Sequence, residues 1–257
     1  MADLEPALRS RLDAGGRAFV PYVTGGLAGV DAELLRGLEE SGADAIEVGI
    51  PFSDPVMDGP VIQEASRRAL VDGATPSSVL GSIKEAGLDV PVAVMTYANP
   101  VWHVGHEAFL DACVDAGVTG VIVPDLPVDE ARDWIAACRR ASVAPIFLAA
   151  PGTSDDRLRA IGDASRGFVY CVATYGVTGA RDRLAETAAE LVGRLRPLTD
   201  RPLLVGVGIA EPSQASQACA FADGVVVGSA LVRPLLDGDP AAALRLTGAF
   251  RAAIDAA

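Results

Sequence analysis

Two carboxyl groups near one predicted strand, those of Glu47 and Asp58, are candidates for acid–base catalysis. Glu47 lies inside an apolar strand, between Ile46 and Val48, where burying an unpaired carboxylate would cost several kcal/mol. The group must therefore find a partner or raise its pKa, and a carboxyl group with a raised pKa is a natural general acid–base. Pairing with an arginine from a neighbouring strand is the alternative, and position alone favours neither.

The second carboxyl group, Asp58, lies in the loop over 51–60, a stiff and polar segment with three prolines. A solvated turn aspartate is the ordinary interpretation of such a position. Asp58 is nevertheless attached to the strand that carries Glu47. This attachment can place two carboxylates over one pocket.

Glycines at the ends of two later strands form a second group of candidate functional residues. Gly206-Val207-Gly208 closes one predicted strand and Gly228-Ser229 closes the next. Glycine lets an anion approach backbone N–H groups, and a helix N-terminus adds a favourable dipole, so these ends predict a phosphate site. The segment 170–179 has two glycines, Gly176 and Gly179, with Thr178 between them, which predict a mobile lid with a further phosphate donor. An ordinary glycine-rich turn is the alternative.

Other residue types exclude several mechanisms. Lys84, the only lysine, lies in a helical stretch over 76–86, which argues against a Schiff base. The only histidines, His103 and His106, make a poor metal site without nearby carboxylates. No Gly-x-Ser-x-Gly motif or cysteine–histidine pairing is present. We therefore expect carboxylate acid–base chemistry on a phosphorylated substrate, with no metal ion and no cofactor.

Around these candidate residues, the sequence repeats a unit of helix, turn and short apolar strand. Continuous apolar runs are typical of a parallel sheet covered on both faces. Amphipathic helices are predicted between them, for example over 30–41 and 128–140, and Asp239-Pro240 predicts the start of the last helix. The predicted strands are 19–24, 45–50, 92–97, 120–125, 145–149, 167–172, 203–207 and 224–228.

Eight evenly spread strands predict an α/β protein, a single (β/α)8 barrel over 1–257 with an extra N-terminal helix. An open, doubly wound sheet is the alternative. In a barrel, chemistry belongs at the carboxyl ends of the strands, which is where the carboxylates and the glycines lie.

The net charge, the lengths of the apolar runs and the cysteines restrict the partners and the cellular location that the sequence allows. The net charge of −13 argues against nucleic acid and anionic membranes as partners. The polar start over 1–17 lacks a signal-peptide core and the apolar runs are too short to cross a membrane, so a cytoplasmic location is expected. Scattered cysteines in apolar segments are expected to be reduced and buried, namely Cys113, Cys138, Cys171 and Cys219.

The segment 47–63, Glu-Val-Gly-Ile-Pro-Phe-Ser-Asp-Pro-Val-Met-Asp-Gly-Pro-Val-Ile-Gln, resembles the hallmark segment of tryptophan synthase alpha chains. Further similar segments follow in the family's order, at 19–24, 95–100, 124–127, 144–147, 176–179 and 228–229. The resemblance implies a lyase of tryptophan biosynthesis that cleaves indole-3-glycerol phosphate to indole and glyceraldehyde 3-phosphate. It also implies a beta chain as partner in an α2β2 heterotetramer.

The resemblance assigns roles to individual residues. It implies that Glu47 and Asp58 are the catalytic pair and that Thr178 meets Asp58 when the lid closes. The indole pocket would be lined by Tyr22, Tyr97 and Asp125, with Tyr170 close to Glu47. The phosphate would be held by Gly179, Gly208, Gly228 and Ser229.

The chain departs from the family's pattern at two places. Thr174 and Tyr175 stand where several family members have an arginine and a small residue, and Gly26-Leu-Ala-Gly29 replaces a frequent Asp-Pro. A related barrel enzyme, indole-3-glycerol phosphate synthase, would be expected to carry strand-end lysines, which this chain lacks. A stand-alone lyase and a catalytically weak activator of a beta chain also remain compatible with the sequence.

Overall fold

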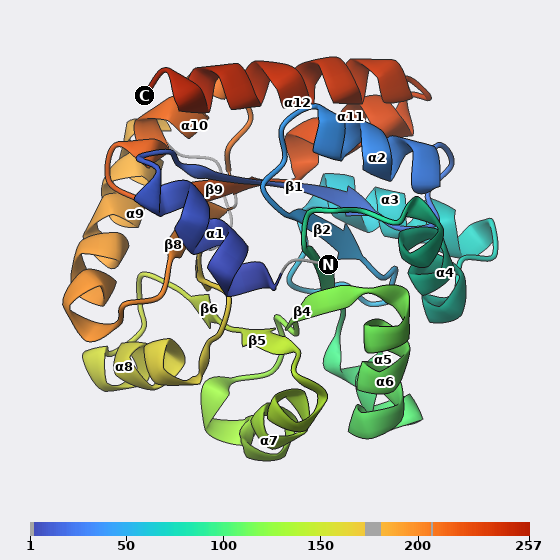
Figure 1. The fold of residues 1–257 in the computed structure, drawn as a ribbon, viewed down its shortest axis with the longest axis horizontal. Coiled ribbons are helices and arrows are strands. Elements are labelled where there is room, and N and C mark those ends of the chain that lie inside the picture. Colours follow the sequence, from blue (N-terminus) through green and yellow to red (C-terminus); the bar gives the residue numbers. More distant parts are fainter. Residues whose placement is uncertain (1–2, 173–180, 207) are drawn as a thin grey trace.

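Parallel strands form the frame of the molecule, as the apolar runs predict. The computed structural model describes residues 3–172, 181–206 and 208–257. Within these residues, nine strands form one sheet in the order β5-β4-β3-β2-β1-β9-β8-β7-β6 (Figure 1). The strands are β1 (Ala18–Thr24), β2 (Ile46–Gly49), β3 (Val92–Met95), β4 (Val118–Ile122), β5 (Ala144–Ile146), β6 (Leu148–Ala149), β7 (Val169–Val172), β8 (Leu203–Gly206) and β9 (Gly224–Val227).

The sheet is a nearly closed barrel, which confirms the predicted fold over the open alternative. β1 pairs in parallel with β9 as well as with β2. The strand predicted over 145–149 is in fact two, because β5 pairs with β4 whereas β6 pairs with β7. Phe147 separates them, and its N–H donates to the Ser165 hydroxyl at 3.3 Å rather than to a strand.

Several predicted strands run too far at their carboxyl ends. The runs predicted over 92–97 and 120–125 end as strands at Met95 and Ile122. Their apolar character continues because Tyr97 and Val123 stay buried in the loops at the barrel mouth. A run of apolar residues indicates burial and not strand pairing, so it does not distinguish a buried strand from a buried loop.

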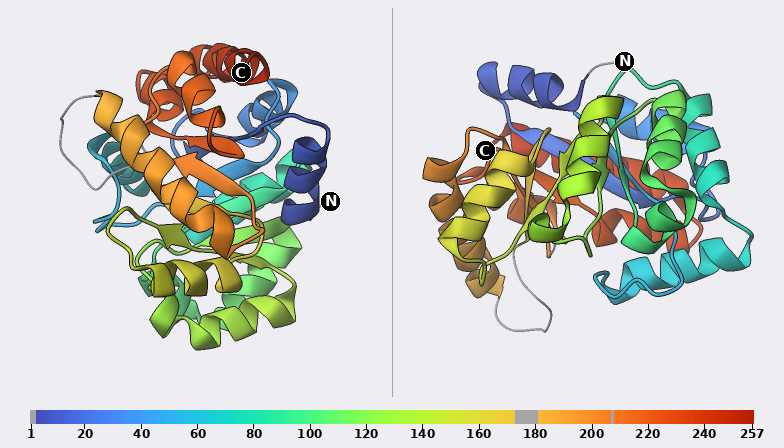
Figure 2. Two further views of the ribbon diagram at one scale, coloured as in Figure 1. Left: turned by 90° about the vertical axis from the view of Figure 1, so that its left-hand side faces the viewer. Right: turned by 90° about the horizontal axis from the view of Figure 1, so that it is seen from below.

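Helices surround the barrel (Figures 1 and 2). The predicted helix over 30–41 is α2, and the one over 128–140 is a short 3-10 turn followed by α7. Asp239 caps the last helix by accepting from the Ala242 N–H at 2.8 Å. The helices are α1 (Leu4–Asp13), α2 (Ala32–Glu40), α3 (Pro60–Val71), α4 (Pro76–Ala86), α5 (Ala98–Val104), α6 (His106–Ala116), η1 (Val128–Glu130), α7 (Arg132–Ala141), α8 (Asp155–Ala164), α9 (Arg181–Leu195), η2 (Arg196–Leu198), α10 (Pro212–Cys219), α11 (Ser229–Leu236) and α12 (Pro240–Asp255).

The extra N-terminal helix α1 covers one end of the barrel, and α3 lies at the other (Figure 2). Leu4 and Leu8 of α1 are buried in the barrel interior, in one cluster with Ile122 and Phe168. Burying each leucine contributes roughly 1.5–3 kcal/mol, so α1 is part of the core rather than an appendage. It closes the end opposite the carboxyl ends of the strands.

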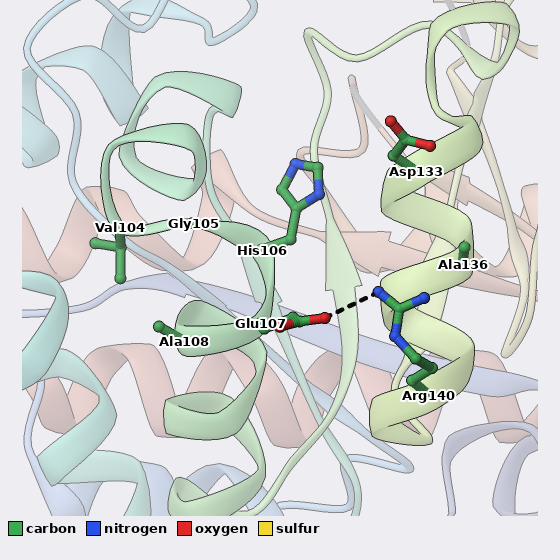
Figure 3. A pocket seen from close by; sticks show the side chains of 8 residues that line it. All are labelled: Val104, Gly105, His106, Glu107, Ala108, Asp133, Ala136 and Arg140. Carbon is green, nitrogen blue, oxygen red and sulfur yellow. Dashed lines mark hydrogen bonds and ion pairs between the residues drawn. The ribbon is translucent and has the colours of Figure 1, made fainter.

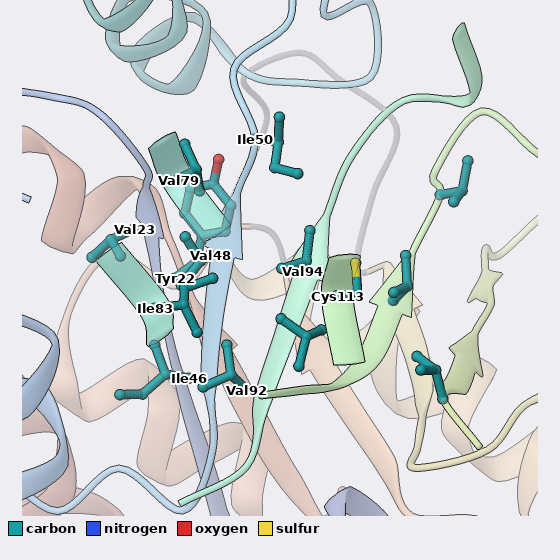
Figure 4. Close-up of a cluster of buried hydrophobic side chains, with 14 of the residues drawn as sticks. Tyr22, Val23, Ile46, Val48, Ile50, Val79, Ile83, Val92, Val94 and Cys113 are labelled. Atoms are coloured by element: carbon teal, nitrogen blue, oxygen red, sulfur yellow. The ribbon is translucent and has the colours of Figure 1, made fainter. Parts of the chain in front are cut away.

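A second core lies between the strands and the outer helices (Figure 4). Val48 and Val94 point outward from neighbouring strands toward Ile83 of α4 and Cys113 of α6. All four cysteines are buried and free, as predicted. Within the described residues, no helix is long and apolar enough to span a membrane.

Candidate active site

Glu47 is buried inside the barrel, one of the few polar residues there. It lies on β2, opposite Tyr22 of β1 and Ala93 of β3. Its side chain is 1% exposed, and its Oε2 has no hydrogen-bond partner among the described residues. Burial, reinforced by the charge of Asp58, raises the pKa of Glu47 to about 8. Since no arginine among the described side chains pairs with Glu47, the raised pKa is how this carboxyl group is accommodated.

Asp58 reaches the same place from the loop that follows β2. Burial raises the pKa of Asp58 to about 6, although a hydrogen bond from the Tyr97 hydroxyl opposes the shift. The same hydroxyl accepts from the Met57 N–H at 3.0 Å, so Tyr97 ties the loop to the end of β3. The solvated turn aspartate is therefore the wrong interpretation of Asp58. At neutral pH the two carboxyl groups differ, with Glu47 mostly protonated and Asp58 mostly ionised.

Two tyrosines, Tyr22 and Tyr170, lie beside the carboxyl groups. Burial raises the pKa of each well above its usual value, and the charges of Asp58 and Glu47 raise it further. Each ring lies over a strand-end glycine: a Cβ at Gly49 would be 2.2 Å from the Tyr22 hydroxyl, and one at Gly206 would be 2.3 Å from that of Tyr170. The glycines are therefore required by the close approach of the tyrosines.

A cavity of about 860 Å³ opens beside Asp58 at the carboxyl ends of β3, β4, β6 and β7. Asp125 also lines it, although its carboxylate accepts from the Ala98 N–H at 2.9 Å at the start of α5. Most of the wall is apolar, which suits an aromatic ring. The apolar wall includes Met95, Ile122, Leu126, Phe147, Leu148 and Val172.

The predicted phosphate residues lie at the next strand ends around the barrel. Gly208 follows β8 with a left-handed φ of 91°. Gly228 precedes the first residue of α11, Ser229, and no side chain in the described part of the chain caps this helix start. A Cβ at Gly228 would lie 3.5 Å from the Tyr22 ring, so this helix N-terminus adjoins the tyrosine beside Glu47. Thr178 and Gly179, like Thr174 and Tyr175, lie outside the described residues.

Comparison with known proteins decides the family. The family model for the tryptophan synthase alpha chain matches residues 9–247. This chain belongs to the tryptophan synthase alpha chain family. The alpha chain of Rippkaea orientalis is 41% identical over 255 residues, which is 97% of this chain and 96% of that protein.

Solved structures agree with this assignment. A ligand-free tryptophan synthase from M. tuberculosis has a chain with a TM-score of 0.89 and 39% identity, covering 99% of this chain and 100% of that one. The tryptophan synthase alpha subunit of Legionella pneumophila has a TM-score of 0.89 and 32% identity, with 100% of both chains covered. These matches confirm the expected (β/α)8 barrel and an alpha chain of tryptophan biosynthesis, a lyase.

Within this alpha-chain barrel, sequence reasoning missed two residues that hold Asp58 in place. Phe52 stacks on Tyr97 with ring centroids 5.1 Å apart. Gln63 of α3 donates to the Asp58 carbonyl oxygen at 2.9 Å. Both belong to the hallmark segment of the family, but no periodicity or charge pattern singles them out.

Neither histidine of this alpha chain lines the cavity beside Asp58: His103 lies on α5, and His106 is the first residue of α6. The ring centroid of His106 lies 4.8 Å from that of Trp102 and 5.5 Å from that of Trp134. Figure 3 shows it above an open groove between α6 and α7, where Glu107 pairs with Arg140. The described residues contain no group of three or more potential metal ligands.

Lys84 also lies away from the site. It is on α4, as predicted, and pairs with Asp115 at 2.9 Å on the surface. Its position leaves the two carboxyl groups as the candidates for proton transfer at the mouth of the barrel.

Proposed function

We propose that this chain cleaves indole-3-glycerol phosphate to indole and glyceraldehyde 3-phosphate, with Glu47 and Asp58 as the catalytic pair. One observation carries the proposal: two buried carboxyl groups have different raised pKa values, about 8 and about 6, and lie close enough for the charge of Asp58 to raise the pKa of Glu47. Asp58 also lines a largely apolar cavity. Such a pair provides an acid and an anion at the same pH. Membership in the alpha-chain family supports the choice of substrate.

The chemistry that we propose needs one proton donor that then becomes an acceptor. Protonated Glu47 gives its proton to the indole carbon that bears the glycerol chain. The Glu47 carboxylate then takes the proton of the adjacent hydroxyl, the carbon–carbon bond breaks, and its electron pair returns to the ring. The hydroxyl carbon becomes the aldehyde, so atoms and charge balance without a further reactant.

The role that we propose for Asp58 is electrostatic. Protonation of the ring carbon places positive charge toward the indole N–H. An ionised carboxylate facing that N–H stabilises the charge as it develops. The Tyr97 hydroxyl, which donates to Asp58, favours the ionised form at neutral pH.

We further propose where the two halves of the substrate bind. The indole ring would lie in the cavity near Tyr22, Tyr97, Asp125 and Tyr170. The phosphate would lie at Gly208, Gly228 and Ser229, where the free N-terminus of α11 offers N–H groups to an anion, together with Thr178 and Gly179. Tyr22, the neighbour of Glu47 in register, adjoins Gly228, which supports a phosphate site close to Glu47.

A beta chain is the partner that we propose, in an α2β2 heterotetramer in the cytoplasm, with residues 1–257 as one domain. The similarity to chains of M. tuberculosis tryptophan synthase supports this partner. Exposed apolar side chains occur on the segments that follow β2 and β3: Val56 is 77% exposed and Trp102 is 47% exposed. A beta chain that covers these side chains would remove their apolar surface from water, which favours association.

The direct test is product formation by the purified chain. With indole-3-glycerol phosphate as substrate, we expect indole and glyceraldehyde 3-phosphate in equal amounts, measured by chromatography and by a coupled dehydrogenase assay. An isolated chain that releases neither product, yet raises the activity of a beta chain, would favour the weak activator. Release of neither product under both conditions would exclude the proposed lyase.

The pH dependence of kcat/KM is expected to be bell-shaped, with limbs near pH 6 and pH 8. Activity falls as the pH drops through the pKa of Asp58, because protonation removes the stabilising charge. It falls again as the pH rises through the pKa of Glu47, because the acid that protonates the ring is lost. Asp58→Asn should lack the acid limb, and a wild-type profile without an alkaline limb would contradict the role of Glu47.

A further inference from the structure

The loop that carries Asp58 is held from two sides. From the end of β3, the Tyr97 hydroxyl contacts it by accepting from the Met57 N–H at 3.0 Å. From α3, the side-chain amide of Gln63 donates to the carbonyl oxygens of Asp58 at 2.9 Å and Pro55 at 3.4 Å. The Asp58 N–H also donates to the Pro55 carbonyl at 3.0 Å, so the amide bridges both ends of one tight turn.

The bridge depends on the chemistry of an amide. One NH2 group has two N–H donors, which is what two carbonyl oxygens in one turn require. Gln63 lies in the first turn of α3, where its own N–H donates to the Gly59 carbonyl at 3.0 Å. Its backbone is therefore fixed by the helix, and its side chain transfers that rigidity to the loop.

We propose that Gln63 is a positioning residue for Asp58: its amide fixes the turn over 55–58 so that the Asp58 carboxylate faces the cavity. This inference rests on the proposed function, because it assumes that Asp58 acts in the cleavage. Gln63 itself is exposed and touches no reacting atom. Its contribution is to hold a charge at the distance and angle that the transition state requires.

Loss of the amide should lower turnover without unfolding the barrel. A catalytic group that moves by about 1 Å can lose up to about a hundredfold in rate. Since Tyr97 still holds the loop from the other side, we expect a decrease of about tenfold in kcat. A looser loop also admits water to Asp58, which reduces the effect of burial, so the acid limb of the pH profile should move below pH 6.

The experiment compares Gln63→Met with Arg67→Met. Methionine keeps the length and helix preference of glutamine but has no N–H donor. Arg67 is the matched control because it lies about one turn further along α3, is exposed, and donates to Glu64 rather than to the loop. For each variant, kcat, KM, the acid limb and thermal unfolding are measured with indole-3-glycerol phosphate.

The proposal is supported if Gln63→Met loses about tenfold in kcat and shifts the acid limb, while KM and unfolding stay close to those of Arg67→Met. It is overturned if kcat and the acid limb match the control, or if any loss follows a general decrease in thermal stability. Asp58→Asn is assayed in parallel. If Asp58→Asn retains turnover, the proposed function of Asp58 fails; if it is inactive while Gln63→Met is normal, only the positioning role fails.

Discussion

Glu47→Gln is expected to reduce indole release by at least about a thousandfold, because the amide has the shape of the acid but cannot exchange a proton. Both proton transfers of the proposed cleavage pass through this one side chain, so no step remains that the variant could still catalyse well. The measurement is steady-state indole formation at about pH 7, between the two expected limbs. Near-normal turnover would falsify the acid–base assignment.

A stability measurement provides the control for folding in this variant. The pKa of Glu47 is about 8 in the folded chain, whereas its usual value is 4.5. Between these pH values the folded chain keeps a proton that the unfolded chain releases, so the free energy of unfolding falls as the pH rises. Glutamine does not titrate, so Glu47→Gln should remove this decrease.

The expected result is therefore an inactive protein that is more stable than the wild type above pH 8. The gain should be on the order of a few kcal/mol, measured by denaturant unfolding at about pH 5 and about pH 9. Asp58→Asn is the comparison: it should lose about a hundredfold in turnover, because it removes stabilising charge without removing the proton carrier. A Glu47→Gln protein that is inactive and less stable at both pH values would point to a folding defect instead.

Much of the barrel could be predicted from the sequence because burial on both faces leaves continuous apolar runs. The break at Phe147 could not, because it depends on which neighbour each half of one run pairs with. Some strands were also predicted to end later than they do, because burial continues past the last paired residue. Tyr97, for example, is as buried beyond β3 as the residues within that strand. Apolar patterning records where the chain avoids water, and strand pairing is a tertiary property.

In the candidate site, the position of Glu47 in the sequence did not decide whether its carboxyl group has a raised pKa or pairs with an arginine. The structure favours the raised pKa, because burial and the charge of Asp58 act in the same direction, and no arginine among the described side chains opposes them. Asp58 could be singled out only by its attachment to the same strand. Gln63 and Phe52 could not be found at all, because hydrogen bonding to a carbonyl and ring stacking depend on how the loop folds back.

A large effect is also expected from the beta chain on the rate of cleavage. The reason is that the loop that carries Asp58 is exposed in the isolated chain. Val56 is 77% exposed and Met57 is 44% exposed, immediately before a carboxylate whose charge the reaction requires. In the isolated chain, water can reach this loop, which weakens the electrostatic stabilisation that Asp58 provides. We therefore expect the isolated chain to be a slow lyase.

A beta chain that covers the barrel mouth should speed the reaction by about tenfold to a hundredfold. Such an increase corresponds to about 1.4–2.8 kcal/mol of tighter binding to the active arrangement of the loop, which an interface can readily supply. The partner would shift a population of loop conformations without adding a catalytic residue. We expect the same contact to extend to α5, where Trp102 and Val104 are also exposed.

The measurement is indole formation with and without a beta chain that demonstrably co-purifies with this chain. Val56→Ser tests the contact: it should reduce the ratio between the rate with the beta chain and the rate of the isolated variant. Val114→Ser is the matched control, because Val114 is 48% exposed on α6, outside the loop. If a stable complex forms and its rate equals that of the isolated chain, partner-driven activation is wrong, and the stand-alone lyase becomes the better description of this alpha chain.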